Sequence, residues 1–255
     1  MCSTCGCGKP DPAAHEHDHG HGHDHDHDHD HDHDDSAAAS VLRVETALLA
    51  ENERFAAYNR GYFDARRIRC FNLISAPGSG KTTLLERTLE GLLRAGVRCA
   101  VIEGDQTTDN DARRIARTGA PVHQIQTGRA CHLDAHQVGH ALERLAPEEG
   151  ALLFVENVGN LICPTEFNLG EHERVVMLSV TEGTDKPAKY PLAFRTATAV
   201  VIGKTDLQPH VDFDVAEALR LIRGLNPGAP VFQLSAKTGQ GMAEWLGWLR
   251  EGRKR

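Results

Sequence analysis

Residues 73–83 read LISAPGSGKTT: an apolar run enters a glycine-rich turn that ends in a lysine and two threonines. The pattern is typical of a phosphate-binding loop, G-x-x-x-x-G-K-[ST], between a strand and a helix, with Ser75 in place of the first glycine. Gly78 and Gly80 permit the left-handed backbone of a phosphate nest, whose N–H groups face phosphate oxygens. Ser75 is small, and the first position mainly excludes bulk. We therefore predict a nucleotide site rather than an ordinary strand-turn-helix connection.

Each polar side chain of this loop has a chemical role in such a site. Lys81 would pair with the β- and γ-phosphates, and the hydroxyl of Thr82 would bind Mg²⁺. The predicted nucleotide contacts of the loop are Ala76, Pro77, Gly78, Ser79, Gly80, Lys81, Thr82 and Thr83.

Outward from the loop, short apolar runs alternate with amphipathic stretches. The predicted strands are 70–75, 98–104, 151–157, 174–180, 199–204 and 230–235, and the predicted helices are 82–96, 108–119, 132–145, 211–225 and 241–251. Strands rich in Val, Ile and Leu that alternate with helices indicate an α/β fold with a mainly parallel sheet covered on both faces. Ligands of such sheets bind at the carboxyl ends of the strands.

The segment AVVIGKTDL (199–207) predicts which base is bound. A carboxylate at Asp206 accepts hydrogen bonds from guanine N1–H and N2–H₂, which adenine lacks, so GTP is favoured over ATP. The stem of Lys204 would lie over the base. The usual guanine motif is N-K-x-D, and Gly203 replaces its Asn, which removes a side chain that braces neighbouring loops. The loop that closes over the guanine is predicted at Ser235, Ala236 and Lys237.

Two further strand ends carry acids. Asp105 in IEGDQ is placed to contact Mg²⁺ directly or through water, and Glu156 begins an E-x-x-G switch in which the N–H of Gly159 could touch the γ-phosphate. Asn160 stands where signalling GTPases often have a water-orienting Gln, so slow intrinsic hydrolysis is predicted. The alternative is that these are ordinary surface acids at strand ends. We predict Lys81, Thr82, Asp105 and Glu156 as the catalytic set.

The net charge of −8 is concentrated in residues 1–35, hereafter the tail, which holds ten acids and one lysine. The remaining residues carry +1, so no nucleic-acid partner is expected. No apolar run approaches the ~20 residues that cross a bilayer, and there is no signal peptide. Seven cysteines without a disulfide pattern indicate a cytoplasmic protein that uses thiols as metal ligands.

The tail itself has the composition of a metal-binding segment. Cys2, Cys5 and Cys7 form C-x-x-C-x-C, and three thiolates with the Cys2 amine, if Met1 is removed, would suit Ni(II). Ten histidines between His15 and His33 alternate mainly with Asp and would form a reservoir of weak metal sites. The alternatives are an incidental cysteine cluster and a solvated spacer or tag. With little to bury, the tail is expected to be disordered without a ligand.

Three residues further along predict an internal metal site. Cys131 and His132 are placed at the start of a helix, and Cys163 lies just beyond the E-x-x-G segment. Two thiolates and an imidazole suit nickel or zinc, and a metal there could sense whether GTP is bound. Each cysteine alone would more often be a core residue, as we expect for Cys70 and Cys99, which lie within strands.

With these residues in place, the chain resembles the hydrogenase nickel-incorporation GTPases, the HypB family. The matching stretches are MCSTCGCG (1–8), SAPGSGKTTLLE (75–86), CAVIEGDQ (99–106), TGRACHLDA (127–135), LLFVENVGNLICP (152–164), LSVTEGTDKPAKYP (178–191), KTDL (204–207) and SAKTGQGMAEWLGWL (235–249). The resemblance covers nearly all of residues 40–255 and the first eight residues, and CHLDA with ENVGNLICP is specific to this family.

The resemblance implies a function and its partners. It implies a GTPase that uses Mg²⁺ and helps to insert Ni²⁺ into [NiFe] hydrogenase, acting with a HypA-type protein on the hydrogenase large subunit precursor. A histidine-rich proline isomerase is a further implied partner. A GTP-dependent homodimer with the internal metal site at its interface is also implied, and Lys186 to Pro191 (K-P-x-K-Y-P) would lie near the dimer face. By position, the metal ligands are Cys2, Cys5 and Cys7 in the tail and Cys131, His132 and Cys163 inside; the nucleotide residues are Lys81, Thr82, Asp105, Glu156, Lys204 and Asp206.

The predicted organisation has three parts: the tail 1–35, a leading helix 36–67 and a P-loop GTPase domain 68–255. Two other functions stay open at this point. One is a nickel store in which the tail is the function, and the other is the related urease-type nickel GTPase. The Cys-His…Cys arrangement favours the hydrogenase reading, because a urease-type site is expected to centre on Cys-x-His.

Overall fold

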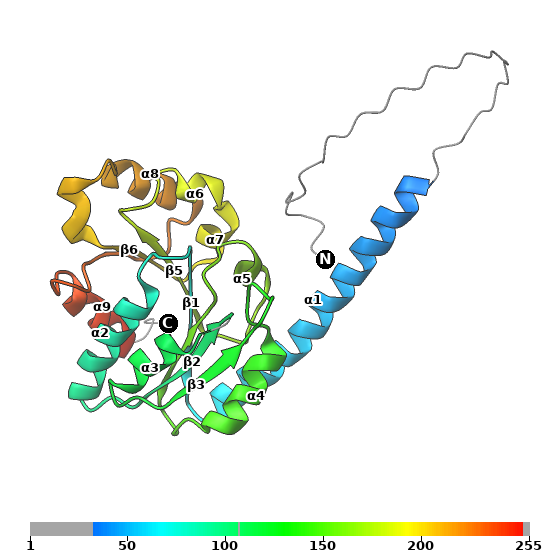
Figure 1. Ribbon diagram of the computed structural model, residues 1–255, viewed down its shortest axis with the longest axis horizontal. Coiled ribbons are helices and arrows are strands. Elements are labelled where there is room, and N and C mark those ends of the chain that lie inside the picture. The colour runs from blue at the N-terminus through cyan, green and yellow to red at the C-terminus, as the bar shows by residue number, and fades with distance from the viewer. Residues whose placement is uncertain (1–32, 107, 252–255) are drawn as a thin grey trace, which may run out of the picture. The chain divides into compact units, whose positions relative to one another are not determined.

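A seven-stranded, wholly parallel sheet organises the computed structural model, which describes residues 33–106 and 108–251 (Figure 1). The strands are β1 (Arg69–Ser75), β2 (Cys99–Asp105), β3 (Val122–Gln126), β4 (Leu152–Glu156), β5 (Glu173–Ser179), β6 (Ala199–Gly203) and β7 (Val231–Gln233). Their order in the sheet is β3-β2-β4-β1-β5-β6-β7. Contacts divide the chain into Met1–Val41 and Leu42–Arg255, and the sheet lies within the second unit.

Helices cover both faces of the sheet, because neighbouring parallel strands must be joined by crossovers. They are α1 (His33–Ala65), α2 (Lys81–Arg94), α3 (Asn110–Ala116), α4 (Ala135–Leu145), α5 (Cys163–Glu166), α6 (Lys186–Lys189), α7 (Pro191–Thr196), η1 (Thr205–His210), α8 (Val215–Leu225) and α9 (Met242–Glu251). Side chains of α2 and α9 share one core cluster with the sheet. The opposite face packs against α1 and α4 at one end and against α7 and α8 at the other.

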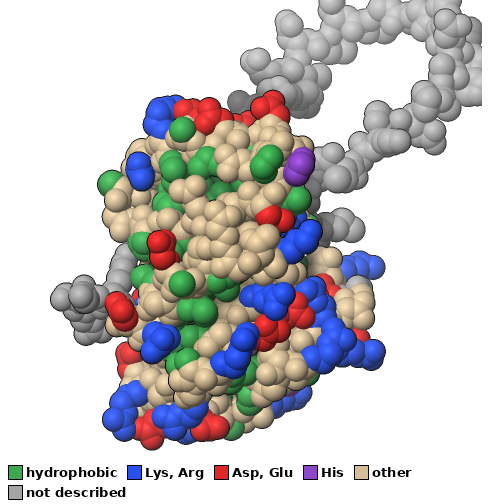
Figure 2. Space-filling view, turned by 90° about the vertical axis from the view of Figure 1, so that its left-hand side faces the viewer, with side chains coloured by type: hydrophobic (Ala, Val, Ile, Leu, Met, Phe, Trp, Pro, Cys, Tyr) green, Lys and Arg blue, Asp and Glu red, His purple; other side chains and the backbone are tan. Residues whose placement is uncertain are grey.

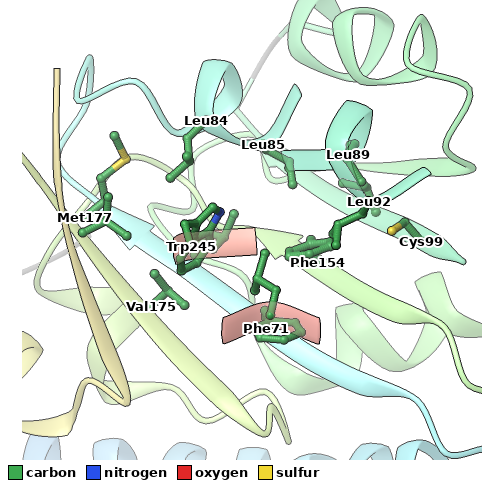
Figure 3. Packing of buried hydrophobic residues seen from close by; sticks show 14 of the residues in the cluster. Phe71, Leu84, Leu85, Leu89, Leu92, Cys99, Phe154, Val175, Met177 and Trp245 are labelled. Carbon is green, nitrogen blue, oxygen red and sulfur yellow. The ribbon is translucent and has the colours of Figure 1, made fainter. Parts of the chain in front are cut away.

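The core beneath α2 is the largest of the three clusters (Figure 3). Leu84 and Leu89 of α2 point onto the sheet, where Phe71 of β1 and Phe154 of β4 stack with ring centroids 5.1 Å apart. Trp245 of α9 is buried in the same cluster, and its indole Nε1–H donates to Thr88 Oγ1 at 2.9 Å. Satisfying that donor lets a large aromatic ring be buried at no hydrogen-bonding cost. The packing under α2 thus buries a large aromatic ring with its polar group paired.

Helix α1 is anchored to the loops around α4 by two buried asparagines. The amide oxygen of Asn52 accepts from the N–H of Ala135 at 2.9 Å, and the amide N–H₂ of Asn59 donates to the carbonyls of Ala135 at 2.8 Å and Leu169 at 3.0 Å. These bonds pair backbone groups that would otherwise be buried without partners. They fix the beginning of α4 in place.

The predicted fold class is confirmed, and all six predicted strands are present. Strand β3 is missed by the sequence reading. It reads VHQIQ, lies at the edge of the sheet and keeps every residue partly exposed, so it lacks the apolar run that marks the other strands. A second correction concerns α4, which begins at Ala135 behind the N-cap Asp134; Cys131 and His132 therefore lie in the preceding loop and not in the helix.

Charged side chains of both signs lie on one face of the folded unit. Figure 2 shows basic side chains gathered mainly in the lower half of this face, with acidic ones among them. This pattern agrees with the near-neutral balance of residues 36–255. Among the helices of residues 33–106 and 108–251, none is long and apolar enough to cross a membrane.

Candidate functional site

The phosphate-binding loop connects the end of β1 to the start of α2. Gly78 and Gly80 have φ values of 72° and 100°, and Gly80 is the N-cap of α2. A residue with a Cβ would be strained at both positions. The turn therefore directs the N-terminus of α2 towards the carboxyl edge of the sheet, where a phosphate group would meet backbone N–H groups and the positive end of the helix dipole.

Ser75, the departure from the loop formula, holds the loop together. Its hydroxyl accepts from Lys81 Nζ at 2.9 Å, also accepts from the Ser79 hydroxyl, and donates to the carbonyl of Ala76 at 2.8 Å. Lys81 is only 9% exposed, and burial lowers the pKa of its ammonium while the nearby Glu156 opposes that shift. A glycine could not supply this hydroxyl, so Ser75 positions the lysine where a phosphate would replace it as the partner.

A cleft of about 470 Å³ opens above the loop at the carboxyl ends of β1, β2 and β4. Ten predicted nucleotide residues line it: Pro77, Gly78, Gly80, Lys81, Thr82, Thr83, Asp105, Glu156, Gly159 and Lys204. A second, smaller pocket, described below, adjoins this cleft. Ala76 and Ser235 are buried and line neither of the two. The remaining predicted residues lie in that second pocket.

The E-x-x-G segment lies directly against the phosphate-binding loop. Glu156 Oε1 accepts from the Thr82 hydroxyl at 2.7 Å, and Ser75 and Asn160 form an isolated backbone bridge. A Cβ on Gly159 would come within 2.9 Å of the Pro77 Cα, so only glycine allows this approach. A change at the γ-phosphate would therefore alter the contacts of the segment that follows β4.

The oxygen donors in the cleft fit Mg²⁺. The Thr82 hydroxyl and the Asp105 carboxylate both line the cleft, and Asp105 Oδ2 is oriented by the Thr108 N–H at 2.9 Å and its hydroxyl at 2.6 Å. One carboxylate oxygen of Glu156 is buried without a hydrogen-bond partner. Hydroxyl and carboxylate oxygens are the ligands that Mg²⁺ prefers. Thr82 and Asp105 are thus the side chains that would hold it.

The sequence reading missed three charged residues that line the cleft, Glu103, Asp111 and Arg114. Burial, and next the charge of Glu156, raises the pKa of Glu103 to about 8; burial raises that of Glu156 to about 7. Arg114 Nη2 contacts Glu86 Oε2 at 2.5 Å, and its Nη1 contacts Asp111 Oδ1 at 3.2 Å. The sequence offers one signal for Glu103, because it is an acid at an inward-facing position of a buried strand.

A narrower pocket of about 200 Å³ adjoins the cleft and matches the predicted base site. Asp206, Lys204, Ala236 and Lys237 line it, together with Ser79, Gly80, Thr83, Met177, Leu207 and Leu234. Asp206 Oδ1 accepts from the Ser235 hydroxyl at 2.6 Å, and Lys204 Nζ donates to the Gly78 carbonyl at 2.7 Å. The loop at Ser235 thus lies beside the carboxylate that would read the base.

The structure also gives a reason for Gly203. A Cβ at this position would lie 2.6 Å from the Met177 Cε, so the methionine occupies the space that the Asn of N-K-x-D would use. The Met177 side chain lines the base pocket. An asparagine at position 203 would therefore require the end of the Met177 side chain to move.

Cys131, His132 and Cys163 come together although 32 positions separate the first from the last. Their ligand atoms all lie within 4.8 Å of one another, and the Cys131 sulfur is 3.8 Å from His132 Nδ1. All three side chains are half-buried, and the His132 ring lies against Phe167 with centroids 3.9 Å apart. We call this group the thiol–imidazole cluster. Two sulfurs and one nitrogen at this spacing can hold a soft or borderline divalent metal and leave a fourth position open.

The electrostatics of the cluster suit metal binding. Burial lowers the pKa of His132, so its imidazole is neutral at pH 7. Burial, followed by the contact with Cys131, raises the pKa of Cys163 to about 11. The Cys163 thiol is therefore protonated at pH 7, and a metal that binds it would have to displace that proton. Cys70 and Cys99 are buried in the core, as expected, and burial raises both pKa values.

Known proteins resemble this chain in sequence along most of its length. The nucleotide-binding domain described as CobW/HypB/UreG matches residues 70–233. Hydrogenase maturation factor HypB of Azotobacter vinelandii is 55% identical over 213 residues, which span 84% of this chain and 70% of that protein. This chain belongs to the HypB family.

Solved HypB structures agree with the fold described above. HypB of Helicobacter pylori in complex with nickel superposes with a TM-score of 0.75 at 38% identity, covering 79% of this chain and 94% of that one. HypB of Archaeoglobus fulgidus gives a TM-score of 0.74 at 42% identity, covering 79% of this chain and 98% of that one. The P-loop GTPase fold predicted from the sequence is thus the fold of solved HypB proteins.

Two further features of the HypB resemblance are the K-P-x-K-Y-P motif and the cysteines and histidines of the tail. In K-P-x-K-Y-P, Lys186 Nζ lies 3.4 Å from Glu182 Oε2 and 5.1 Å from the Tyr190 ring centroid, while Lys189 pairs with Asp185 at 2.7 Å. These contacts stabilise the turn between β5 and α7. Cys2, Cys5, Cys7 and the histidines preceding His33 lie outside the described residues.

Proposed function

We propose that this chain hydrolyses GTP and uses the hydrolysis to control nickel at the thiol–imidazole cluster during [NiFe] hydrogenase maturation. The observation that carries the proposal is the position of one segment. It starts at Glu156, which bonds Thr82 of the phosphate-binding loop, passes Gly159 against Pro77, and reaches Cys163. Only three residues lie between Gly159, which contacts the loop, and the metal ligand Cys163.

The hydrolysis step would use side chains already at the cleft. Lys81 exchanges its bond to Ser75 for the β- and γ-phosphates and neutralises the charge that develops there. Thr82 and Asp105 hold Mg²⁺, which supplies charge neutralisation when bound. Asp206 receives the N1–H and N2–H₂ groups of guanine, and Ser235 orients its carboxylate. With Asn160 near the attacking water instead of Gln, intrinsic turnover is slow and a partner or dimerisation accelerates it.

Nickel is the cargo in this proposal. The solved H. pylori relative was crystallised with nickel, and the S₂N donor set of Cys131, His132 and Cys163 suits Ni²⁺ or Zn²⁺. A shift of the segment that carries Cys163 would break a donor set held by one loop and by the start of α5. GTP binding and hydrolysis would then change nickel affinity by moving one ligand of three.

The family membership supports further parts of the proposal. We expect a cytoplasmic, GTP-dependent homodimer with the cluster at its interface, a HypA-type nickel partner, a histidine-rich proline isomerase partner, and the hydrogenase large subunit precursor as final acceptor. Lys186 to Pro191 would lie near the dimer face. The tail would bind nickel through Cys2, Cys5 and Cys7 and store more on its histidines.

A nickel-transfer assay tests the proposal. Nickel-loaded full-length protein is mixed with a colorimetric chelator as acceptor in the presence of GTP, GDP or a non-hydrolysable GTP analogue. The expected result is a release rate that differs between GDP and the analogue, lost in C131S/C163S. Equal rates with all nucleotides, with release only in proportion to the total bound metal, would instead support a nickel store centred on the tail.

A further inference from the structure

Glu103 is a buried acid in a position that the strand pattern reserves for apolar residues. Successive side chains of β2 point to opposite faces of the sheet. Cys99 and Val101 belong to the core under α2, so Glu103 lies on that same face one step closer to the strand end. It is 2% exposed and lines the nucleotide cleft. An acid buried here costs folding free energy unless something compensates its charge.

A second buried acid lies beside it. In the register of β2 and β4, Glu103 pairs with Glu156, which is 4% exposed. One oxygen of each carboxylate, Oε2 in both, is buried without a hydrogen-bond partner, whereas Glu156 Oε1 is occupied by the Thr82 hydroxyl. Such unpartnered buried oxygens require an explanation, because almost all buried polar atoms in folded proteins are paired.

The charges around Glu103 are mostly negative. Glu156, Asp105 and Asp111 all raise its pKa, and the cation that acts on it directly is Lys81, which already bonds Ser75. The other two cations that line the cleft are engaged elsewhere, because Arg114 pairs with Asp111 and Glu86 and Lys204 Nζ donates to the Gly78 carbonyl. Like charges in a low-dielectric site repel strongly, and a divalent cation removes the repulsion.

We propose that Glu103 is a positioning residue for the Mg²⁺ of the bound nucleotide. Its free carboxylate oxygen accepts hydrogen bonds from water molecules that Mg²⁺ retains, beside the Thr82 hydroxyl and Asp105. Mg²⁺ dehydrates reluctantly and is held in proteins through few direct ligands and several waters, so a buried acceptor near those ligands increases its affinity. This assignment rests on the proposed GTPase function and adds a third side chain to Thr82 and Asp105.

The test is the Mg²⁺ affinity of the GDP complex of the full-length protein, measured by the Mg²⁺ dependence of GDP dissociation. Glu103→Gln retains an oxygen acceptor and the side-chain volume but removes the charge. The expected result is Mg²⁺ binding weakened ~10- to 100-fold, with unchanged GDP affinity in EDTA. Excess Mg²⁺ should restore slow GDP release.

Glu182→Gln is the matched control. Glu182 Oε2 is also buried without a hydrogen bond, but it forms an ion pair with Lys186 Nζ at 3.4 Å, Glu182 Oε1 accepts from the Ser179 N–H at 3.0 Å, and the residue is outside those that line the cleft. Its Mg²⁺ affinity should equal that of the wild type. A Glu103→Gln protein with wild-type Mg²⁺ affinity would overturn the assignment and leave Glu103 as a neutral buried acid.

Two further measurements separate the possible failures. If Glu103→Gln does not fold, Glu103→Asp keeps the charge and retracts it by one methylene; weakened Mg²⁺ binding supports the assignment, and unchanged binding contradicts it. If the wild type itself shows no Mg²⁺-dependent retention of GDP, the proposed GTPase function fails. Retention in the wild type and an equal value in the Glu103 variants would reject the role of Glu103 alone.

Discussion

The nucleotide cleft and the thiol–imidazole cluster are built in opposite ways. Side chains of the cleft extend from adjacent strand ends and from the start of α2, and they already bond one another, as Lys81 does to Ser75 and Thr82 to Glu156. The cluster takes Cys131 and His132 from the loop before α4 and Cys163 from the first position of α5, and these residues are half-buried. The cleft is thus set by the sheet, whereas the cluster depends on where one short segment lies. The thiol–imidazole cluster is therefore the site that can respond to a change in the nucleotide cleft.

The largest effect is expected from the lysine of the cleft. Lys81→Met removes the only ammonium of the phosphate-binding loop, so GTP hydrolysis should fall on the order of a thousandfold. The full-length variant should bind nickel as tightly as the wild type in the absence of nucleotide. Single-turnover hydrolysis and a chelator competition measure the two quantities. A parallel loss of nickel binding would show that the two regions are not separate sites.

The reciprocal change addresses the cluster. C131S/C163S replaces two thiolates with poor metal ligands, and nickel at this site should weaken at least 100-fold, beyond the cost of losing an outer-shell partner. Nickel K-edge absorption of the protein loaded with one equivalent should then lose part of its sulfur signature. GTP affinity should stay within about twofold. Cys99→Ser, a buried thiol outside the cluster, serves as the control.

A third change sharpens the description of the cleft by testing its base pocket. Asp206→Asn puts an amide N–H₂ where guanine offers its own donors, so GTP affinity should fall roughly 10- to 100-fold, from the loss of a charge-assisted hydrogen bond. Xanthosine triphosphate carries a C2 carbonyl that the new amide can bond, so its affinity should rise. Equilibrium competition with a fluorescent GDP analogue measures both. An unchanged preference for GTP would show that Asp206 does not read the base.

The smallest effect concerns stability against pH. Because burial raises the pKa of Glu103 to about 8, the folded protein keeps a proton that the unfolded chain loses above about 4.5. The folded state thus binds more protons across this interval, and stability falls as the pH rises from 4.5 to 8. Glu103→Gln removes that loss, so the nucleotide-free and metal-free variant should melt ~3 °C above the wild type at pH 8.

Thermal unfolding followed by circular dichroism gives the comparison. At pH 5, where Glu103 is protonated in the folded state, the difference between the two proteins should be smaller than at pH 8. A variant that is less stable than the wild type at pH 8 would contradict the predicted sign.

Local patterns were sufficient for the parts of the molecule that are continuous in sequence. LISAPGSGKTT, the apolar strands and KTDL each carry their own signal within about ten residues, and the sheet and the linings of the two pockets agree with them. Strand β3 was not predicted, because an edge strand need not be apolar. Glu103 was not predicted as a site residue, because Asp105, two positions later, has the more familiar role of a Mg²⁺ ligand. Only burial distinguishes the two acids.

The sequence by itself determined the α/β fold, the phosphate-binding loop and the residue types that could hold a metal, because periodicity and loop chemistry are local properties. The tertiary structure alone decided three other matters. It placed Cys163 beside Cys131 and His132, it set Glu103 against Glu156, and it made Ser75 the partner of Lys81. The first two depend on segments that lie far apart in the sequence and meet only in the fold, while Ser75 and Lys81 are six residues apart and meet because the loop turns back at Gly78 and Gly80.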